Sequence, residues 1–247
     1  MVRGILIAGN ECALFSALCV EAAKRVESYA TALIPRSIDS AGRGQSSEQD
    51  KSSKRQLVLD WNPGSPISGR TLVLSAINKM EHIDDAILVC VPPAYRKNTE
   101  DLSPADIDTL IDYHIKGWFF LVRELAAAFK TRNGGTPVST KAGTLISGGT
   151  PVSAKAGTLA LVLPELNAAS RDDTPDLLGP AVTAAFRSFA QSVLAASSGA
   201  PYNTLGFSSS EPGEENAFAA YVFKTMEEGK RNSGKWHKYG KFGLFGR

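Results

Sequence analysis

The stretch that most constrains the fold runs from residue 157 to residue 195. It opens at 157–163 with a continuous apolar run, which is typical of a strand buried on both faces. After a polar loop at 166–175, apolar residues recur at three- and four-residue steps along 177–195, the period of a helix that covers a sheet. A strand that feeds a helix in this order predicts one central βα unit of a parallel sheet.

The same unit indicates where functional groups would lie. Ligands of open α/β sheets bind beyond the carboxyl ends of the strands, so the groups of this unit are expected at 163–183. That window holds Pro164, Glu165, Asn167, Ser170 and several acidic residues, but no Tyr, Lys, His or Cys. The sequence therefore indicates a fold more clearly than a reaction.

The rest of the chain continues the alternation of strand and helix. Apolar runs predict further strands at 4–8, 29–36, 57–60, 85–91 and 202–207, and helical periodicity predicts helices at 12–28, 66–80, 104–130 and 214–228. We therefore expect one domain over residues 1–247 with an α/β fold, in which a doubly wound, Rossmann-like parallel sheet has helices on both faces.

Three segments interrupt this pattern. A flexible loop is expected at 37–55, which is rich in Ser, Gly and charge. Residues 134–147 and 148–161 form a tandem repeat; because two copies cannot build a solenoid, we interpret the first copy as an inserted loop, with a functional lid as the alternative. Residues 234–247 mix basic and aromatic side chains, which can bind single-stranded nucleic acid, but we expect a last strand followed by a tail packed on a neighbouring subunit.

Composition argues against several classes of function. The formal net charge is only +2, so no sequence-wide field favours nucleic acid or an anionic membrane. Cys12, Cys19 and Cys90 lie in apolar segments without the spacing of a metal site, which predicts buried free thiols in a reducing compartment and no metal. The apolar run before Asn10 is too short for a signal peptide or a membrane span. We expect a cytoplasmic protein.

The first strand and helix begin as a dinucleotide-binding unit does, but without its glycines. If Gly9 is the first glycine, Ala13 and Phe15 stand where the pattern needs the other two. Phe15 would then intrude on the pyrophosphate; alternatively it is a core residue of the first helix, and either interpretation weakens the phosphate site. Arg36, after the second strand, could meet a ribose 2′-phosphate or simply be solvated.

Four features of the chain, at Asp60 and at residues 84–89, 112–120 and 157–163, resemble the short-chain dehydrogenase/reductase family. Residues 112–120 are similar to the family's helix in which an Asn stands one turn before a Gly-aromatic run, and 84–89 resembles its fourth strand. Asp60 resembles the acidic residue that contacts adenine, and 157–163 resembles the strand that delivers the catalytic Ser. The resemblance extends along nearly the whole chain and rests on the order and spacing of the elements. It implies the family's fold, with NAD(P) as cofactor and oxidoreductase activity.

The sequence departs from that family at its catalytic groups. In the family a Tyr acts as general acid/base, a Lys four residues later lowers its pKa, and a Ser orients the substrate oxygen. Alignment puts Gly179 at the Tyr and Thr183 at the Lys, with Pro164 at or beside the Ser and His114 at the Asn. Residues 90–93, Cys-Val-Pro-Pro, replace the Asn-Asn-Ala-Gly turn after the fourth strand. Neither Gly179 nor Thr183 can move a proton.

His114 is the titratable group at these positions. Tyr113 and Lys116 are close to it in sequence, but helical residues one or two apart do not share a face, so the three do not form a constellation. We expect His114 to be a structural histidine with its hydrogen bonds satisfied rather than a catalytic one.

These features predict a protein with the family's fold and without its chemistry. We expect a catalytically inactive binding or assembly protein that takes no cofactor; the alternative is an NAD(P)-dependent oxidoreductase that works with unconventional residues. Nothing in the sequence predicts a nucleic-acid partner.

Self-association is expected through two long helices, 104–130 and 177–197. Trp118, Phe119 and Phe120 are consecutive, so at least one of them cannot reach the sheet and leaves apolar surface on the outer face. Members of the resembled family commonly pair these two helices. A homodimer or homotetramer is therefore predicted.

Overall fold

A parallel sheet of seven strands forms the centre of the computed structural model, which describes residues 3–34, 56–91, 99–132, 156–165 and 178–240. The strand order is β3-β2-β1-β4-β5-β6-β7, and every neighbouring pair is parallel. This order confirms the predicted doubly wound fold. The strands are β1 (Ile5–Gly9), β2 (Tyr29–Leu33), β3 (Gln56–Leu59), β4 (Asp85–Val89), β5 (Thr158–Pro164), β6 (Asn203–Ser209) and β7 (Lys235–Tyr239).

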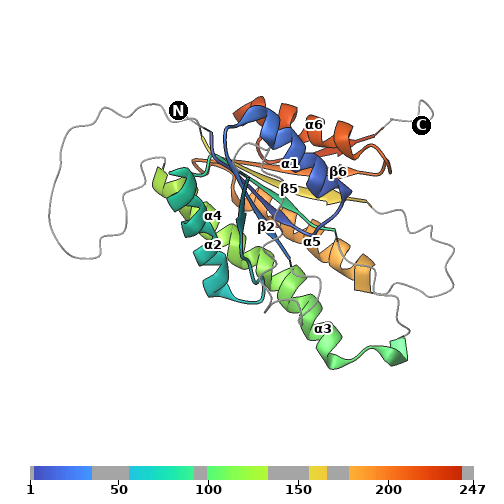
Figure 1. The fold of residues 1–247 in the computed structure, drawn as a ribbon. Helices are drawn as coiled ribbons and strands as arrows, with labels where there is room; N and C mark the ends of the chain where they lie inside the picture. The colour runs from blue at the N-terminus through green and yellow to red at the C-terminus, as the bar shows by residue number, and fades with distance from the viewer. Residues whose placement is uncertain (1–2, 35–55, 92–98, 133–155, 166–177, 241–247) are drawn as a thin grey trace, which may run out of the picture.

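Helices cover both faces of the sheet (Figure 1). One face carries α2, α4 and α5, and the other carries α1 and α6, which pack side by side. The helices are α1 (Ala13–Arg25), α2 (Pro66–Met80), α3 (Pro104–Ile111), α4 (Gly117–Arg132), α5 (Leu178–Ala196) and α6 (Glu215–Glu227).

The central strands are buried on both faces because successive side chains enter different cores. Along β5, Leu159, Leu161 and Leu163 pack with α4 and α5, whereas Ala160 and Val162 pack with α1 and α6. All five side chains are inaccessible to solvent. The continuous apolar run at 157–163 was therefore correctly interpreted as a central strand.

Local signals in the sequence fix the starts of two helices. Ser65 accepts a hydrogen bond from the backbone of Ser68 and precedes a proline in the first turn of α2. Ser103 and Asp106 form a reciprocal capping box at the start of α3. Each side chain satisfies a backbone donor that the first helical turn leaves without a partner.

The predicted helix at 104–130 is continuous but not regular. A π-helical turn, η3 (Asp112–Lys116), separates α3 from α4 and contains His114. Such turns insert an extra residue, shift the face that the following residues present, and often occur at functional sites. Gly117, which follows directly, lies against Pro63: a Cβ there would be 2.4 Å from the proline Cβ.

Several expectations concern the ends of elements and the intervening segments. Strands β2 and β4 end at Leu33 and Val89, earlier than predicted. The loop at 37–55 and the first repeat copy at 134–147 lie outside the described residues. The C-terminal region contains the expected last strand, β7, while 241–247 lie outside the described part of the chain. No helix among the described residues is long and apolar enough to cross a membrane.

Candidate functional site

The carboxyl ends of the parallel strands meet at one edge of the sheet, where ligands of such folds bind. Gly9 ends β1 and packs against β4, where a Cβ would lie 2.2 Å from the carbonyl oxygen of Val89. Asn10 then ties the two strands together, because its side-chain oxygen accepts a hydrogen bond from Val91 N at 3.2 Å. Close packing between strands thus explains Gly9 without any phosphate.

Of the two interpretations that the sequence left open for Phe15, the structure supports the core residue. Phe15 does not project toward the carboxyl edge, where it would block a pyrophosphate; it is only 5% exposed and packs in the core between α1 and the sheet. Cys12 caps the helix, and its sulfur accepts a hydrogen bond from Phe15 N at 3.3 Å. Burial raises the pKa of Cys12, so this thiol is not poised to ionise.

Gly179 and Thr183, which the sequence alignment puts at the family's Tyr and Lys, lie in the first turns of α5. Gly179 is buried, and the Thr183 hydroxyl donates a hydrogen bond to the Gly179 carbonyl at 2.9 Å. The hydroxyl is therefore used inside the helix. Pro164, which the alignment puts at or beside the family's Ser, is the last residue of β5 and carries no hydroxyl.

An ion pair joins β5 to α5 immediately beyond Pro164. Arg187 Nη2 lies 2.6 Å from Glu165 Oε1, and the guanidinium also lies over the Trp236 ring, 5.7 Å from its centre. Trp236 in turn donates a hydrogen bond to Ser208 Oγ at 3.1 Å. Partial burial acts to raise the pKa of Glu165, but the ion pair with Arg187 and a hydrogen bond with Ser208 lower it overall. Sequence reasoning missed this link because its members are far apart in the chain.

Carboxylates line a cavity of about 230 Å³ at the same edge. They belong to Glu165, Glu211 and Glu215, and the apolar part of the wall includes Leu14 from the first turn of α1 and Phe218 from α6. Three carboxylates thus lie next to the amino end of α1, one of them paired with the Arg187 guanidinium. The helix dipole alone would favour an anion there.

His114 lies in the π-helical turn and is buried, with only 3% of its surface exposed to solvent. Burial lowers its pKa to about 4, so the imidazole is neutral at neutral pH. Its Nδ1 atom has no hydrogen-bond partner among the described residues. His114 is therefore not the fully hydrogen-bonded histidine that the sequence predicted, and its structural role stays a prediction.

An aromatic cluster fills the space between the π-helical turn, α5 and the end of β3. Trp118 packs against Trp61 and Phe186, with ring centres 5.4 Å and 5.3 Å apart. The Cys90 thiol lies against Trp118, and burial raises the pKa of this thiol far above its ordinary value. The consecutive apolar residues at 118–120 hint at this cluster, but its members from other elements could not be inferred from the sequence.

The remaining predicted cofactor residues are Asp60 and Arg36. Asp60 is exposed beyond the end of β3, and the next residue, Trp61, turns into the core. Arg36 lies outside the described residues, so its predicted role stays untested. Among the described residues, no group of His, Cys, Asp and Glu is arranged to hold a metal ion.

Comparison with known proteins identifies the fold. No family model and no curated protein matches the chain. Solved structures do: the NADH-dependent reductase A1-R′ in complex with NAD has 13% identity over 96% of this chain and 94% of its own, with a TM-score of 0.65. A short-chain dehydrogenase/reductase from Serratia marcescens has 12% identity, 96% coverage of both chains and a TM-score of 0.63.

A putative short-chain alcohol dehydrogenase from Burkholderia multivorans has 14% identity, again covers 96% of both chains, and has a TM-score of 0.60. The matches extend over nearly all of each chain. At this level of identity they show the fold of short-chain dehydrogenases/reductases, and they agree with the resemblance seen in the sequence.

Proposed function

We propose that this chain uses the short-chain dehydrogenase/reductase fold as a non-catalytic binding or assembly protein. The observation that supports the proposal is at the start of α5: Gly179 and Thr183 align with the family's Tyr and Lys, and the Thr183 hydroxyl donates a hydrogen bond to the Gly179 carbonyl. Residues 166–195 contain no Tyr or Lys that a shifted alignment could supply.

In the part of the chain that the structure describes, the nearby titratable groups do not replace the missing pair. A general acid/base works best with a pKa near the operating pH. Burial lowers the pKa of His114 to about 4 and raises that of Cys90, so both are neutral near pH 7 and shielded from solvent. Glu165 is held as a carboxylate by Arg187. None of these groups is suited to exchange a proton with a substrate carbonyl.

We further propose that NAD(P) does not bind in the usual mode. A pyrophosphate would lie at the amino end of α1, and the acidic cavity that includes Leu14 places Glu165, Glu211 and Glu215 beside it. Arg187 offsets the charge of Glu165, so the carboxylates of Glu211 and Glu215 are the groups expected to repel the phosphates; Phe15, which is buried in the core, does not block them. The NAD complex of the A1-R′ reductase is the reason to test this point directly.

The assembly part of the proposal rests on the outer faces of the helices at 104–130 and 177–197. Phe119 is 55% exposed and its ring centre lies 4.4 Å from that of Phe189 on α5, so an aromatic pair faces outward. Ile107 on α3 is also 43% exposed. A homodimer or homotetramer would remove this apolar surface from water. A cytoplasmic location and the lack of a nucleic-acid partner remain predictions.

Hydride transfer provides the test of the catalytic part. Purified protein is incubated with NADH or NADPH and a panel of aldehydes and ketones, and nicotinamide absorbance is followed against an active short-chain dehydrogenase. We expect no consumption above the rate without protein. A rate proportional to protein concentration would instead support the alternative, an NAD(P)-dependent oxidoreductase with unconventional residues.

A further inference from the structure

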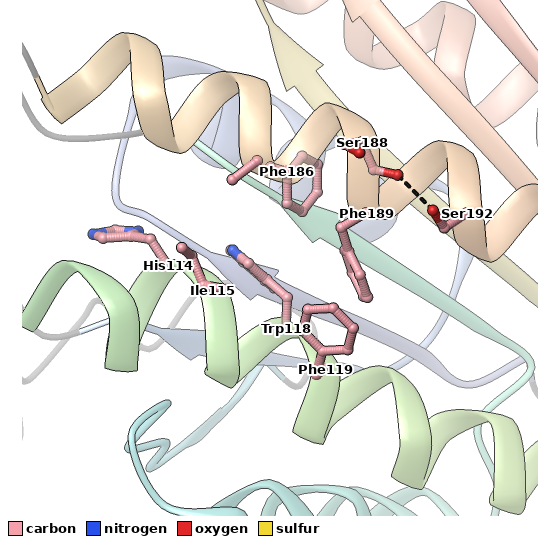
Figure 2. Close-up of a pocket in the computed structure, with 9 residues that line it drawn as sticks. His114, Ile115, Trp118, Phe119, Phe186, Ser188, Phe189 and Ser192 are labelled. Atoms are coloured by element: carbon pink, nitrogen blue, oxygen red, sulfur yellow. Dashed lines mark hydrogen bonds between the residues drawn. The ribbon is translucent and has the colours of Figure 1, made fainter. Parts of the chain in front are cut away.

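A groove of about 520 Å³ runs between α2 and α4, which pack side by side (Figure 1), and reaches the amino end of β4. Its volume lies within the range of small-molecule sites. Figure 2 shows the other side of α4, where Phe119 lies against Phe189 of α5; neither residue lines the groove. The groove also shares no lining residue with the acidic cavity at the carboxyl edge. It is therefore separate from both the aromatic pair proposed for assembly and the edge where a dinucleotide would lie.

The middle of the groove is aliphatic and open to solvent. Leu74 of α2 is 49% exposed, and Ala127 of α4 is exposed as well. No Phe, Tyr or Trp is among the described residues that line the groove, so an aliphatic chain suits it better than an aromatic ring. The apolar lining residues are Val73, Leu74, Ile77, Ile83, Ala127 and Ala128.

Most of the charged groups in the groove already have partners. Arg132 Nη1 lies 2.5 Å from Asp84 Oδ1, and His82 Nε2 lies 3.0 Å from Oδ2 of the same carboxylate. Glu124 Oε1 lies 2.8 Å from Arg123 Nη2. Two charges of opposite sign are left, because neither side chain forms an ion pair with any residue that the structure describes. They belong to Arg70 and Glu81.

These two side chains lie at opposite ends of the groove. Glu81 directly follows α2, three helical turns beyond Arg70, so the two positions are roughly 16 Å apart along the helix axis at about 1.5 Å per residue. Leu74 and Ile77 lie between them on the same stripe of the helix. The groove thus offers a positive end, an aliphatic middle and a negative end.

Glu81 is unfavourable in its place for the stability of the fold alone. It is the only non-glycine residue with a positive φ among the described residues, with φ 70° and ψ −35°. Glycine adopts such a φ without strain, and a carboxylate at the carboxyl end of a helix meets the negative end of the helix dipole. Strained residues of this kind cluster at binding sites. A bound cation would give this carboxylate the partner that the described fold does not supply.

We propose that the groove binds a linear aliphatic compound that carries an ammonium group at one end and a carboxylate at the other. The ammonium meets Glu81 and the hydroxyl of Thr131, which donates to the Ala127 carbonyl at 3.0 Å and can still accept a hydrogen bond. The carboxylate meets the guanidinium of Arg70, whose paired donors match it. The site is away from the carboxyl edge, so it goes beyond the proposed loss of catalysis and does not depend on it.

The probe is ω-aminooctanoate, and its affinity is measured by ligand-observed NMR titration of the full chain. Ala127→Trp should fill the groove and lower the affinity at least about tenfold. Ala217→Trp is the matched control, because Ala217 is an exposed alanine of α6 on the other face of the sheet; it should leave the affinity unchanged. Circular dichroism confirms that both variants are folded before binding is compared.

Two probes with a single head group test the two ends separately. Glu81→Gln should weaken the binding of octylamine about two- to fivefold, the range of an exposed ion pair, and should not weaken that of octanoate. Arg70→Gln should do the reverse. Lys79→Gln removes an exposed charge of α2 that does not line the groove, so it should weaken neither probe.

Glu81→Gly separates binding from stability. Glycine relieves the strain of a positive φ, so this variant should keep the melting temperature of the wild type or raise it. It should nevertheless bind ω-aminooctanoate more weakly, because the carboxylate is gone. A residue with a structural role alone would instead lower the melting temperature when replaced and leave the affinity unchanged.

Several results would overturn the proposal. They are a lack of saturable ω-aminooctanoate binding, equal binding by Ala127→Trp and Ala217→Trp, and octylamine binding that does not respond to Glu81→Gln. Light scattering should give the same mass for Ala127→Trp and the wild type; a lower mass for the variant would show that a second copy of the chain covers the groove instead. None of these measurements follows hydride transfer, so a failure here is distinguishable from a failure of the non-catalytic proposal.

Discussion

Replacing His114 should remove a specific part of the protein's acid sensitivity. Burial lowers the folded-state pKa of His114 to about 4, from an ordinary value of 6.5. Between these two pH values the unfolded chain binds a proton that the folded chain does not. The free energy of unfolding must therefore fall as the pH drops below about 6.5, and the loss is complete near pH 4.

The size of this loss follows from the shift itself. A lowering from 6.5 to about 4 corresponds to about 3 kcal/mol at about 1.4 kcal/mol per pKa unit. At about pH 5.5 roughly 1.4 kcal/mol of it has been lost relative to about pH 7.5. His114 is almost fully buried, so solvent screening does not reduce this figure as it would for a surface group.

Urea unfolding of the wild type and of His114→Gln, at about pH 7.5 and 5.5, measures the effect. Glutamine does not titrate in this range, whereas the carboxylates and other histidines affect both proteins alike. The difference in unfolding free energy between the two proteins should therefore change by roughly 1.4 kcal/mol between the two pH values. Equal pH dependence in both proteins would refute the placement of a neutral, desolvated imidazole in the π-helical turn.

Three further perturbations test other parts of the structure. Gly117→Ala should lower the unfolding free energy by about 1–3 kcal/mol, because the new Cβ would lie 2.4 Å from the Pro63 Cβ. Gly64→Ala, whose nearest contact would be at 3.4 Å, should be close to neutral in the same urea titration. Equal effects of the two substitutions would contradict the close approach of Gly117 to Pro63. Deletion of residues 134–147 should leave a folded protein by circular dichroism, since β5 comes from the second copy, and a molten or insoluble product would mean that the first copy is structural. Phe119→Ser should shift the mass measured by light scattering toward the 26.3 kDa monomer, whereas Val20→Ser, a similarly exposed position on α1, should not; a wild-type mass of 26.3 kDa would refute assembly.

The fold was largely predictable because its signals are local. The apolar run of β5 and the helical period that follows it predict a buried strand and its covering helix, and the structure places both within a residue or two. The Pro66–Met80 helix was predicted at both of its ends, since Ser65 and the proline after it mark its start. Propensity, capping and burial agree in these elements, so the sequence pattern is sufficient.

The site was less predictable because its contacts are distant in sequence. Whether Phe15 faces a phosphate or the core depends on the rotation of α1, which packing against β1 and β4 decides. The π-helical turn at His114 depends on how α3 and α4 fit against their neighbours, and no local sequence pattern predicts it. The Glu165–Arg187 pair joins residues 22 positions apart through the geometry of the βα unit. Of the features that decide the proposed chemistry, the sequence alone established one, the absence of Tyr and Lys from residues 166–195.

Binding of dinucleotides is the most direct test of the proposed loss of cofactor and catalysis. Thermal unfolding is measured with and without millimolar NADH and NADPH. A ligand at 100 times its dissociation constant stabilises the folded state by roughly 2.7 kcal/mol, which a melting curve detects readily. Because Glu165, Glu211 and Glu215 line the cavity next to the start of α1, we predict no change in melting temperature with either cofactor. A clear, saturable increase with NADH or NADPH would contradict the account.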